Sequence, residues 1–268
     1  IEQGSQELLL EREGNKWYVA DERYPGDTEA VGNLIELVSD LGTVDVISAR
    51  RNYQQYELTG SNAYNLSLEQ EGTEILTLTL GAKASAGNSV YARVNERPEV
   101  VLLPFQLREQ ASVDPTDFRD KVMAELDGEA VTRAVVSGEG YGDITLTATE
   151  NPDVPEDAST AQRIDASSSA EAPESVDLGR IPNFLQELGS LKAQDFLDSP
   201  PEGSPFATVT VTLDGGGQEL FEVYPPQDES LYPVTASTSE YPFLVPEYRA
   251  RRLLLGTPEL FERFSEEE

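Results

Sequence analysis

The 268-residue sequence contains neither cysteine nor histidine, and this absence excludes several kinds of chemistry. Without Cys there is no disulfide framework, no thiolate nucleophile and no soft-metal site. Without His the commonest general base near neutral pH is missing, together with the usual ligand of zinc, copper and iron. Ser-His-Asp and Cys-His catalysis are therefore excluded, and only oxygen ligands for hard cations remain.

Basic residues are also scarce, since 19 of them stand against 50 acidic residues. Only four are lysines: Lys16, Lys83, Lys121 and Lys192. The formal net charge of -31 creates a field that repels phosphate backbones and anionic lipid head groups. We therefore expect no nucleic acid as a partner, and no membrane contact through a basic patch.

Long apolar runs are missing as well. None approaches the ~18 residues that are needed to cross a bilayer, and no signal peptide is visible. The chain begins at Ile1, without Met, directly before strand-like sequence. We expect a trimmed or mature form, with an anchor or signal upstream of it in the full-length protein.

The chain does contain an internal repeat. The stretch 27–48 recurs at 177–198 without a gap. Four pairs are identical, namely Asp27/Asp177, Asn33/Asn183, Leu41/Leu191 and Asp45/Asp195. Six more exchange one apolar side chain for another: Val31/Ile181, Leu34/Phe184, Ile35/Leu185, Val38/Leu188, Val46/Phe196 and Ile47/Leu197. Self-similarity at a fixed offset predicts two tandem repeats.

Each repeat is predicted to be α+β, with a mainly antiparallel sheet packed by one central amphipathic helix. In the first repeat, Asp27 or Thr28 can cap this helix and Gly42 can end it. Its apolar stripe consists of Val31, Leu34, Ile35, Val38 and Leu41. Strands are expected at 7–11, 16–19, 64–68, 76–80, 90–94 and 100–103, and helices at 105–110 and 117–126.

The second repeat follows the same order. Its helix starts at Asp177 and is expected to carry Leu178, Ile181, Leu185 and Leu188 on one side. Pro182 falls in the first turns, where proline is tolerated. Strands are expected at 130–136, 144–149, 208–213, 220–224, 231–232 and 241–246, and helices at 247–255 and 258–264.

Residues 150–175 interrupt the second repeat with a segment rich in Pro, Asp, Ser and Ala. This composition buries too little apolar surface to offset the entropy of ordering the chain. We interpret the segment as a mobile insertion, with a disordered partner-binding segment as the alternative. The expected domains are residues 1–127 for the first repeat and 128–268 for the second.

Few residues are candidates for chemistry. Two acid-rich segments, 114–120 and 151–157, lack the spacing of a calcium loop, which favours a helix cap and solvated surface. The glycines of 214–217 join two strands and lack a Gly-Lys-Ser/Thr ending, which favours a hairpin over a phosphate loop. Paired carboxylates meet in space and leave no spacing signal, so a carboxylate-only hydrolase stays open as an alternative. We predict no catalytic, cofactor-binding or metal-binding residues.

Two further groups of side chains have both a structural and a functional interpretation. Trp17 and the tyrosines are expected in the core or on a sheet face, with a ligand platform as the alternative. Arg249, Arg251 and Arg252 form a dense basic cluster near the end of an expected helix. We expect them to pair with carboxylates and the helix dipole, with a docking patch for an acidic partner as the alternative.

The order of these motifs resembles the bacterial domain of unknown function 4340 family. The motifs are Lys16-Trp-Tyr-Val19, the helix from Asp27 to Leu41-Gly42, Tyr56-Glu-Leu58, the strand from Tyr64 to Leu68, and Val90-Tyr-Ala-Arg-Val94. The likeness covers nearly the whole chain as two copies. The second copy departs from it, since it lacks a Trp-bearing strand before its helix and a Tyr-Glu-Leu element after Asp198.

The resemblance implies an N-terminal membrane-spanning helix, an extracytoplasmic body and association with ABC exporters of the gliding-motility type. It supplies no catalytic residues. We therefore expect a non-enzymatic accessory module without a cofactor, located in the periplasm or on the outer face of the cytoplasmic membrane. Its expected partners are proteins, such as permease components of an exporter. The alternative is a periplasmic or cell-surface protein that binds a small molecule or polysaccharide in the cleft between the repeats.

The high acidity has two explanations that differ in their response to salt. Adaptation to a salty exterior predicts that the melting temperature rises steeply up to molar NaCl, because salt screens the self-repulsion of the acidic surface. An ordinary acidic surface predicts a shallow dependence. Thermal unfolding at increasing NaCl concentration distinguishes the two.

Overall fold

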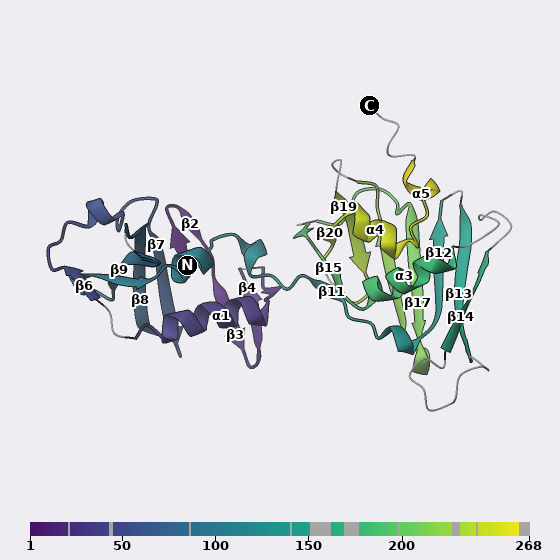
Figure 1. Cartoon of the computed structure of the whole chain (residues 1–268), viewed down its shortest axis with the longest axis horizontal. Coiled ribbons are helices and arrows are strands. Elements are labelled where there is room, and N and C mark those ends of the chain that lie inside the picture. The colour runs from purple at the N-terminus through teal and green to yellow at the C-terminus, as the bar shows by residue number, and fades with distance from the viewer. Residues whose placement is uncertain are drawn as a thin grey trace. The chain divides into compact units, whose positions relative to one another are not determined.

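A computed structural model describes residues 1–20, 22–42, 45–85, 87–139, 141–150, 162–168, 177–197, 199–226, 231–239 and 241–262. The chain divides into two compact units, Ile1–Asp120 and Lys121–Glu268. Both consist mostly of antiparallel sheet with a few helices (Figure 1), which confirms the α+β class. The expected repeats, residues 1–127 and 128–268, stay a prediction.

The first unit is built on a seven-stranded sheet of the order β2-β1-β7-β8-β9-β10-β6, in which all neighbours are antiparallel. Its strands are β1 (Glu2–Gln3), β2 (Gln6–Glu7), β6 (Asp45–Ser48), β7 (Tyr64–Gln70), β8 (Thr73–Lys83), β9 (Ser89–Val94) and β10 (Val100–Pro104). A small sheet beside it contains β3 (Leu10–Glu13), β4 (Lys16–Val19) and β5 (Tyr24–Pro25). The expected strands at 16–19, 64–68 and 76–80 are therefore confirmed, and tight turns at residues 14 and 72 join β3 to β4 and β7 to β8.

Helix α1 (Thr28–Ser39) is the main helix of this unit. One carboxylate oxygen of Asp27 accepts hydrogen bonds from the backbone nitrogens of Glu29 at 2.8 Å and Ala30 at 3.0 Å, which satisfies two orphan donors of the first turn. Val31, Leu34 and Val38 are buried, because the helix turns its apolar stripe away from solvent. The expected cap by Asp27 and three positions of the stripe are confirmed. Ile35 is only half-buried. The helix ends at Ser39, so Leu41 and the expected stop at Gly42 lie beyond it.

The helix expected over 117–126 is wrong. The structure has a 3₁₀ turn, η2 (Pro115–Asp117), followed by extended chain. The backbone nitrogen of Asp120 donates to the carbonyl of Pro25, and that of Asp27 donates to the carbonyl of Phe118, both at 2.8 Å. These residues close the first unit, because they pair with the chain just before α1 and leave no backbone donors for a helix.

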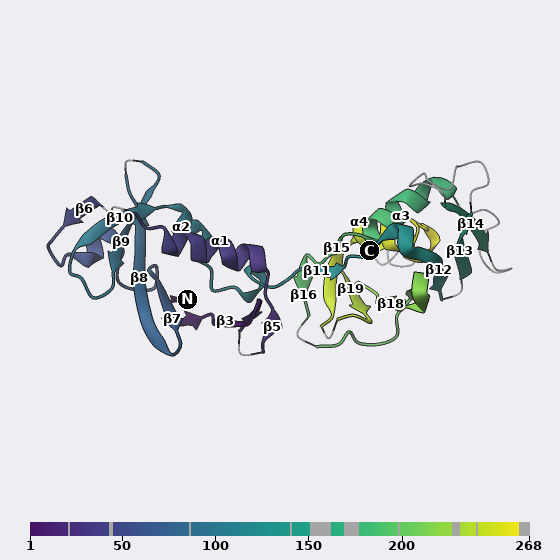
Figure 2. The same cartoon turned by 90° about the horizontal axis from the view of Figure 1, so that it is seen from below.

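The remaining short elements of the first unit are η1 (Tyr53–Tyr56) and α2 (Gln106–Gln110). Figure 2 shows α1 and α2 on the same side of the first sheet. The η1 turn lies close to β8, where Gly81 is buried. A Cβ atom at Gly81 would lie 2.1 Å from the carbonyl oxygen of Tyr56, so this approach requires glycine.

The second unit is built on an eight-stranded antiparallel sheet of the order β14-β13-β12-β17-β18-β19-β20-β16. Its strands are β12 (Val131–Gly138), β13 (Gly142–Glu150), β14 (Gln162–Ser168), β16 (Asp195–Phe196), β17 (Ala207–Leu213), β18 (Gln218–Val223), β19 (Leu231–Ala236) and β20 (Phe243–Pro246). A separate pair joins β11 (Val122–Ala124) to β15 (Leu191–Lys192). The short turns are η3 (Gly128–Ala130) and η5 (Asp214–Gly216).

Part of the expected mobile insertion is a strand. Strand β14 pairs with β13 from Ile144↔Ser168 to Glu150↔Gln162. The edge of β13 offers unpaired backbone groups, and pairing satisfies them even though β14 carries few large apolar side chains. Residues 151–161 and 169–175 of the expected insertion lie outside the described residues.

The helix of the repeated stretch is α3 (Ile181–Leu188), entered through the 3₁₀ turn η4 (Leu178–Arg180). Asp177 caps this entry by accepting a hydrogen bond from the backbone nitrogen of Gly179 at 3.0 Å. Ile181 and Leu188 are buried, but Leu185 is only half-buried and Leu178 is 59 % exposed. Leu178 was expected on the stripe; it lies outside because it belongs to the tighter turn, which shifts its direction.

Two more helices, α4 (Glu247–Leu253) and α5 (Glu259–Glu262), follow β20. Helices α3 and α4 cover the same face of the second sheet (Figure 2). The two sheets share a run of five strands, β7-β8-β9-β10-β6 and β17-β18-β19-β20-β16. In the first run, the edge strand β6 directly follows α1; in the second, β15 lies between α3 and the edge strand β16. No helix in the described parts of the chain has the length and apolar character that a bilayer crossing requires.

Two glycines of the first unit give opposite predictions for the same substitution. Gly81→Ala should destabilise the protein by about 1–3 kcal/mol, because the new methyl group collides with the backbone of η1. Gly32→Ala should stabilise it by roughly 0.5–1 kcal/mol, because this helical position has nothing within 4 Å of the added Cβ. Urea unfolding of both variants measures the difference, and equal effects would contradict the close approach at Gly81.

Candidate functional site

The acid-rich segment 114–120 contains a cap for a 3₁₀ turn. Asp114 caps η2, because its carboxylate accepts a hydrogen bond from the backbone nitrogen of Thr116 at 2.9 Å. This confirms the helix-cap interpretation for the segment 114–120. The segment 151–157 lies outside the described residues. Within the part of the chain that the structure describes, no group of three acidic side chains is placed to hold a metal ion.

The glycine-rich stretch 214–217 is a hairpin turn, as expected. It joins β17 to β18, and Gly215 and Gly216 have φ angles of 78° and 87°. Glycine adopts these left-handed angles without strain, which explains its repetition here. The turn opens no helix and therefore offers no phosphate cradle.

The arginine cluster of α4 pairs with carboxylates, as expected. Arg249 contacts Glu187 of α3 at 2.6 Å, and Arg252 faces the other oxygen of Glu187 at 3.6 Å. Arg251 pairs with Glu247 one turn earlier on α4. Burial lowers the pKa of Arg249, but the charge of Glu187 and hydrogen bonds to Tyr248 and Glu187 raise it above its usual value overall.

Glu187 itself was not singled out from the sequence. It is only 2 % exposed, which is unusual for a carboxylate and is explained by its two arginine partners. One signal was available, since the first copy has Leu37 at this position of the repeated helix. A charged residue in place of leucine near the stripe indicates a partner on a neighbouring element.

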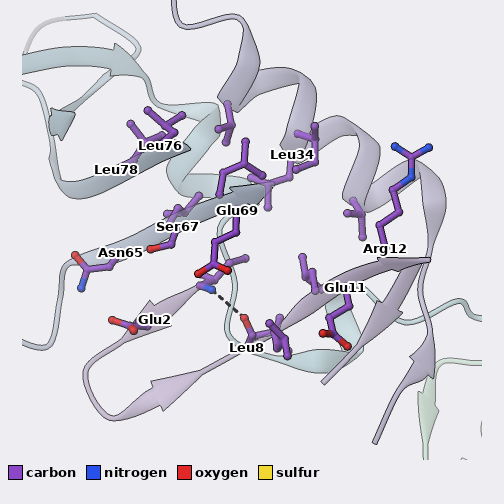
Figure 3. A pocket seen from close by; sticks show the side chains of 18 of the residues that line it. Glu2, Leu8, Glu11, Arg12, Leu34, Asn65, Ser67, Glu69, Leu76 and Leu78 are labelled. Atoms are coloured by element: carbon purple, nitrogen blue, oxygen red, sulfur yellow. Dashed lines mark hydrogen bonds between the residues drawn. The ribbon is translucent and has the colours of Figure 1, made fainter. Parts of the chain in front are cut away.

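A cavity of about 510 Å³ lies within the first unit. Its walls come from α1, from the hairpin β7–β8 and from the segment 8–12 (Figure 3). Buried apolar side chains form its floor: Leu8, Val31, Leu34, Val38, Leu66 and Leu78. Half-buried Trp17 also lines it, so this residue is part of a wall of the cavity. Its volume lies within the range of about 300–1,000 Å³ that is typical of ligand pockets.

Carboxylates gather at the rim of this cavity. The lining includes Glu2, Glu7, Glu11, Glu69 and Glu71, all of which are exposed to solvent. Figure 3 shows the carboxylates of Glu2, Glu11 and Glu69 on the side away from the helix. The rim of the cavity is therefore solvent-exposed and negatively charged, whereas its floor is apolar.

Few positive groups offset this charge. Arg12 is the one basic side chain among the described residues that line the cavity; its Nε donates to the carbonyl of Gly14 and its guanidinium lies 5.8 Å from the centre of the Trp17 ring. Arg23 pairs with Glu11 at 3.0 Å from outside the lining. The nitrogen of Ile1 donates to the carbonyl of Leu8 at 2.8 Å, which is the dashed line in Figure 3.

The second unit carries phenylalanine at two positions where the first unit has leucine. The repeated helix aligns Leu34 with Phe184, and strand order matches the pair Leu66↔Leu78 of the first sheet with Val209↔Phe221 of the second, so Phe221 replaces Leu78 while the smaller Val209 replaces Leu66. Phe184 and Phe221 are both 0 % exposed and belong to the core of the second unit. Sequence reasoning missed the cavity, although the smaller side chains of the first copy were its signal.

The chain was compared with known proteins and families. The family model described as domain of unknown function (DUF4340) matches residues 17–208, which is more than half of the chain. Neither the curated proteins nor the solved structures contain a match to it.

The ion pair between α3 and α4 can be tested by substitution. Arg249→Met should destabilise the protein by about 2–3 kcal/mol, less than the roughly 3–5 kcal/mol typical of breaking a buried pair, because Arg252 still faces Glu187. Adding Glu187→Leu should recover most of this loss, since leucine leaves no buried charge. Denaturant unfolding of the single and double variants measures this, and a double variant as unstable as the single one would contradict it.

Proposed function

We propose that this chain, which belongs to the DUF4340 family, is a non-enzymatic extracytoplasmic module that assists an ABC exporter through protein–protein contacts. The observation that carries the proposal is the family match over 17–208, which extends across parts of both units. Members of this family resemble anchored extracytoplasmic proteins that accompany exporters. The full-length protein would be held at the membrane by an N-terminal anchor.

The absence of an enzymatic role is supported by the residues themselves. The sequence offers no histidine or cysteine for general-base or nucleophilic catalysis. The side chains that stood out as candidates have structural partners, since Asp114 caps a turn and the arginines of α4 pair with carboxylates. The buried carboxylate of Glu187 likewise has structural partners, since it pairs with Arg249 and faces Arg252 of α4.

We further propose that the two units arose by duplication of one folding unit. Three observations support this. The two sheets share their five-strand order. Asp27 and Asp177 cap the equivalent helices. The buried positions of the two helices also coincide at the offset of the repeat, with Val31, Leu34 and Val38 in α1 and Ile181, Phe184 and Leu188 in α3.

A second candidate function is ligand binding, and the cavity of the first unit favours it. From the sequence, the alternative function was expected to bind its ligand in a cleft between the repeats. The cavity instead lies within one unit, under α1, and combines an apolar floor with polar groups at its mouth. This combination is typical of small-molecule sites.

The exporter proposal predicts a physical association. The full-length protein, tagged at its C-terminus, would be purified from solubilised native membranes, and an untagged strain would serve as the control. We expect the ATPase and permease subunits of an ABC exporter to be enriched, as identified by mass spectrometry. Recovery of no transporter component, together with a genomic neighbourhood without ATPase and permease genes, would contradict the proposal.

A further inference from the structure

We infer that the cavity of the first unit binds a small amphiphile with an apolar body and a cationic group. This inference rests on ligand binding, the second of the two proposed functions, and names the chemical class of the ligand. Three features of the cavity lead to it: the space between α1 and its sheet, the apolar floor, and the sign of the charge at the rim.

The space exists because the side chains that meet there are small. Leu34 on α1 and Leu78 on β8 both line the cavity, and both are buried. The second unit has Phe184 and Phe221 at these positions, and each is completely buried. Since a duplicated position can carry phenylalanine in a well-packed core, the smaller leucines of the first unit leave room that a ligand can fill.

The apolar floor of the cavity favours a ligand with an apolar body. Leu8, Leu34 and Leu78 present only hydrocarbon to the cavity, and the neighbouring stripe of α1 adds Val31 and Val38. Transfer of a hydrocarbon chain from water to such a surface is favourable in proportion to the apolar area that is buried. A purely polar ligand, such as a sugar, would leave its hydroxyl groups without partners there.

The negatively charged rim of the cavity favours a ligand with a positively charged group. Five glutamates line the cavity against one arginine and the terminal ammonium of Ile1. Arg12 already lies near the Trp17 ring, and the ammonium already donates to the carbonyl of Leu8. The carboxylate of a fatty acid would meet like charges at Glu2 and Glu69, which is unfavourable. An ammonium group at the same place would meet opposite charges, and the net charge of -31 would also raise the local concentration of cations.

The test uses three probes that share one octyl chain and differ only in the head group: octyltrimethylammonium, octanol and octanoate. Isothermal titration calorimetry of the whole chain at low ionic strength gives the three dissociation constants. We expect the cation to bind at least about tenfold more tightly than octanoate, with octanol between them. Added NaCl should reduce this preference, because it screens the rim.

Two double variants and one matched control locate the site. Leu34→Phe/Leu78→Phe copies the second unit and should weaken binding of all three probes by more than about tenfold. Ile75→Phe is the control, because this exposed residue lies on the hairpin β7–β8 but outside the cavity lining. Glu2→Gln/Glu69→Gln changes only exposed side chains and should lower the preference for the cation several-fold while leaving octanol binding unchanged.

The possible failures are distinguishable. If none of the three probes binds to the unsubstituted protein, both the ligand class and the binding function are overturned. If octanoate binds as tightly as the cation, the ligand class is overturned and the binding function stands. If the filled variant, folded by circular dichroism, binds the probes as well as Ile75→Phe does, the cavity is not the site.

Discussion

Each unit depends on one constraint: an amphipathic helix must bury its apolar stripe against one face of an antiparallel sheet. The same pattern meets this constraint twice, since Val31, Leu34 and Val38 are buried in α1 and Ile181, Phe184 and Leu188 in α3. Asp27 caps α1 directly, and Asp177 caps the 3₁₀ turn η4 that leads into α3. Further along the chain, β6 after α1 and β16 after α3 each pair at an edge of their own sheet.

The two units meet this constraint with different side chains, and this difference gives them different properties. The second unit fills its core with Phe184 and Phe221 and adds the buried Glu187, which arginines of α4 neutralise. The first unit has Leu34 and Leu78 instead and retains a cavity. Under the proposed duplication, the second copy keeps a packed core while the first copy has a cavity.

Features that depend on neighbours in the sequence could be predicted from it. The Asp27 and Asp177 caps, three positions of the α1 stripe and the hairpins β3–β4, β7–β8 and β17–β18 follow from local periodicity and turn residues, and the structure confirms them. Features that depend on distant partners could not. The segment after Asp117 has helical composition but pairs with β5 and β15. Strand β14 is held by its pairing with the edge of β13. Leu178 lies off the apolar stripe because a 3₁₀ turn precedes α3. The cavity depends on the volumes of side chains that are far apart in the sequence, and no single sequence pattern indicates it.

Hydrogen exchange of backbone amides in the whole chain, compared between the unsubstituted protein and Leu34→Ala, tests the central claim most directly. If the stripe of α1 holds the first sheet, removing this buried side chain should speed exchange throughout β7, β8, β9 and β10, because their protection depends on the packed helix. Strands that keep their protection while α1 alone exchanges faster would contradict the account.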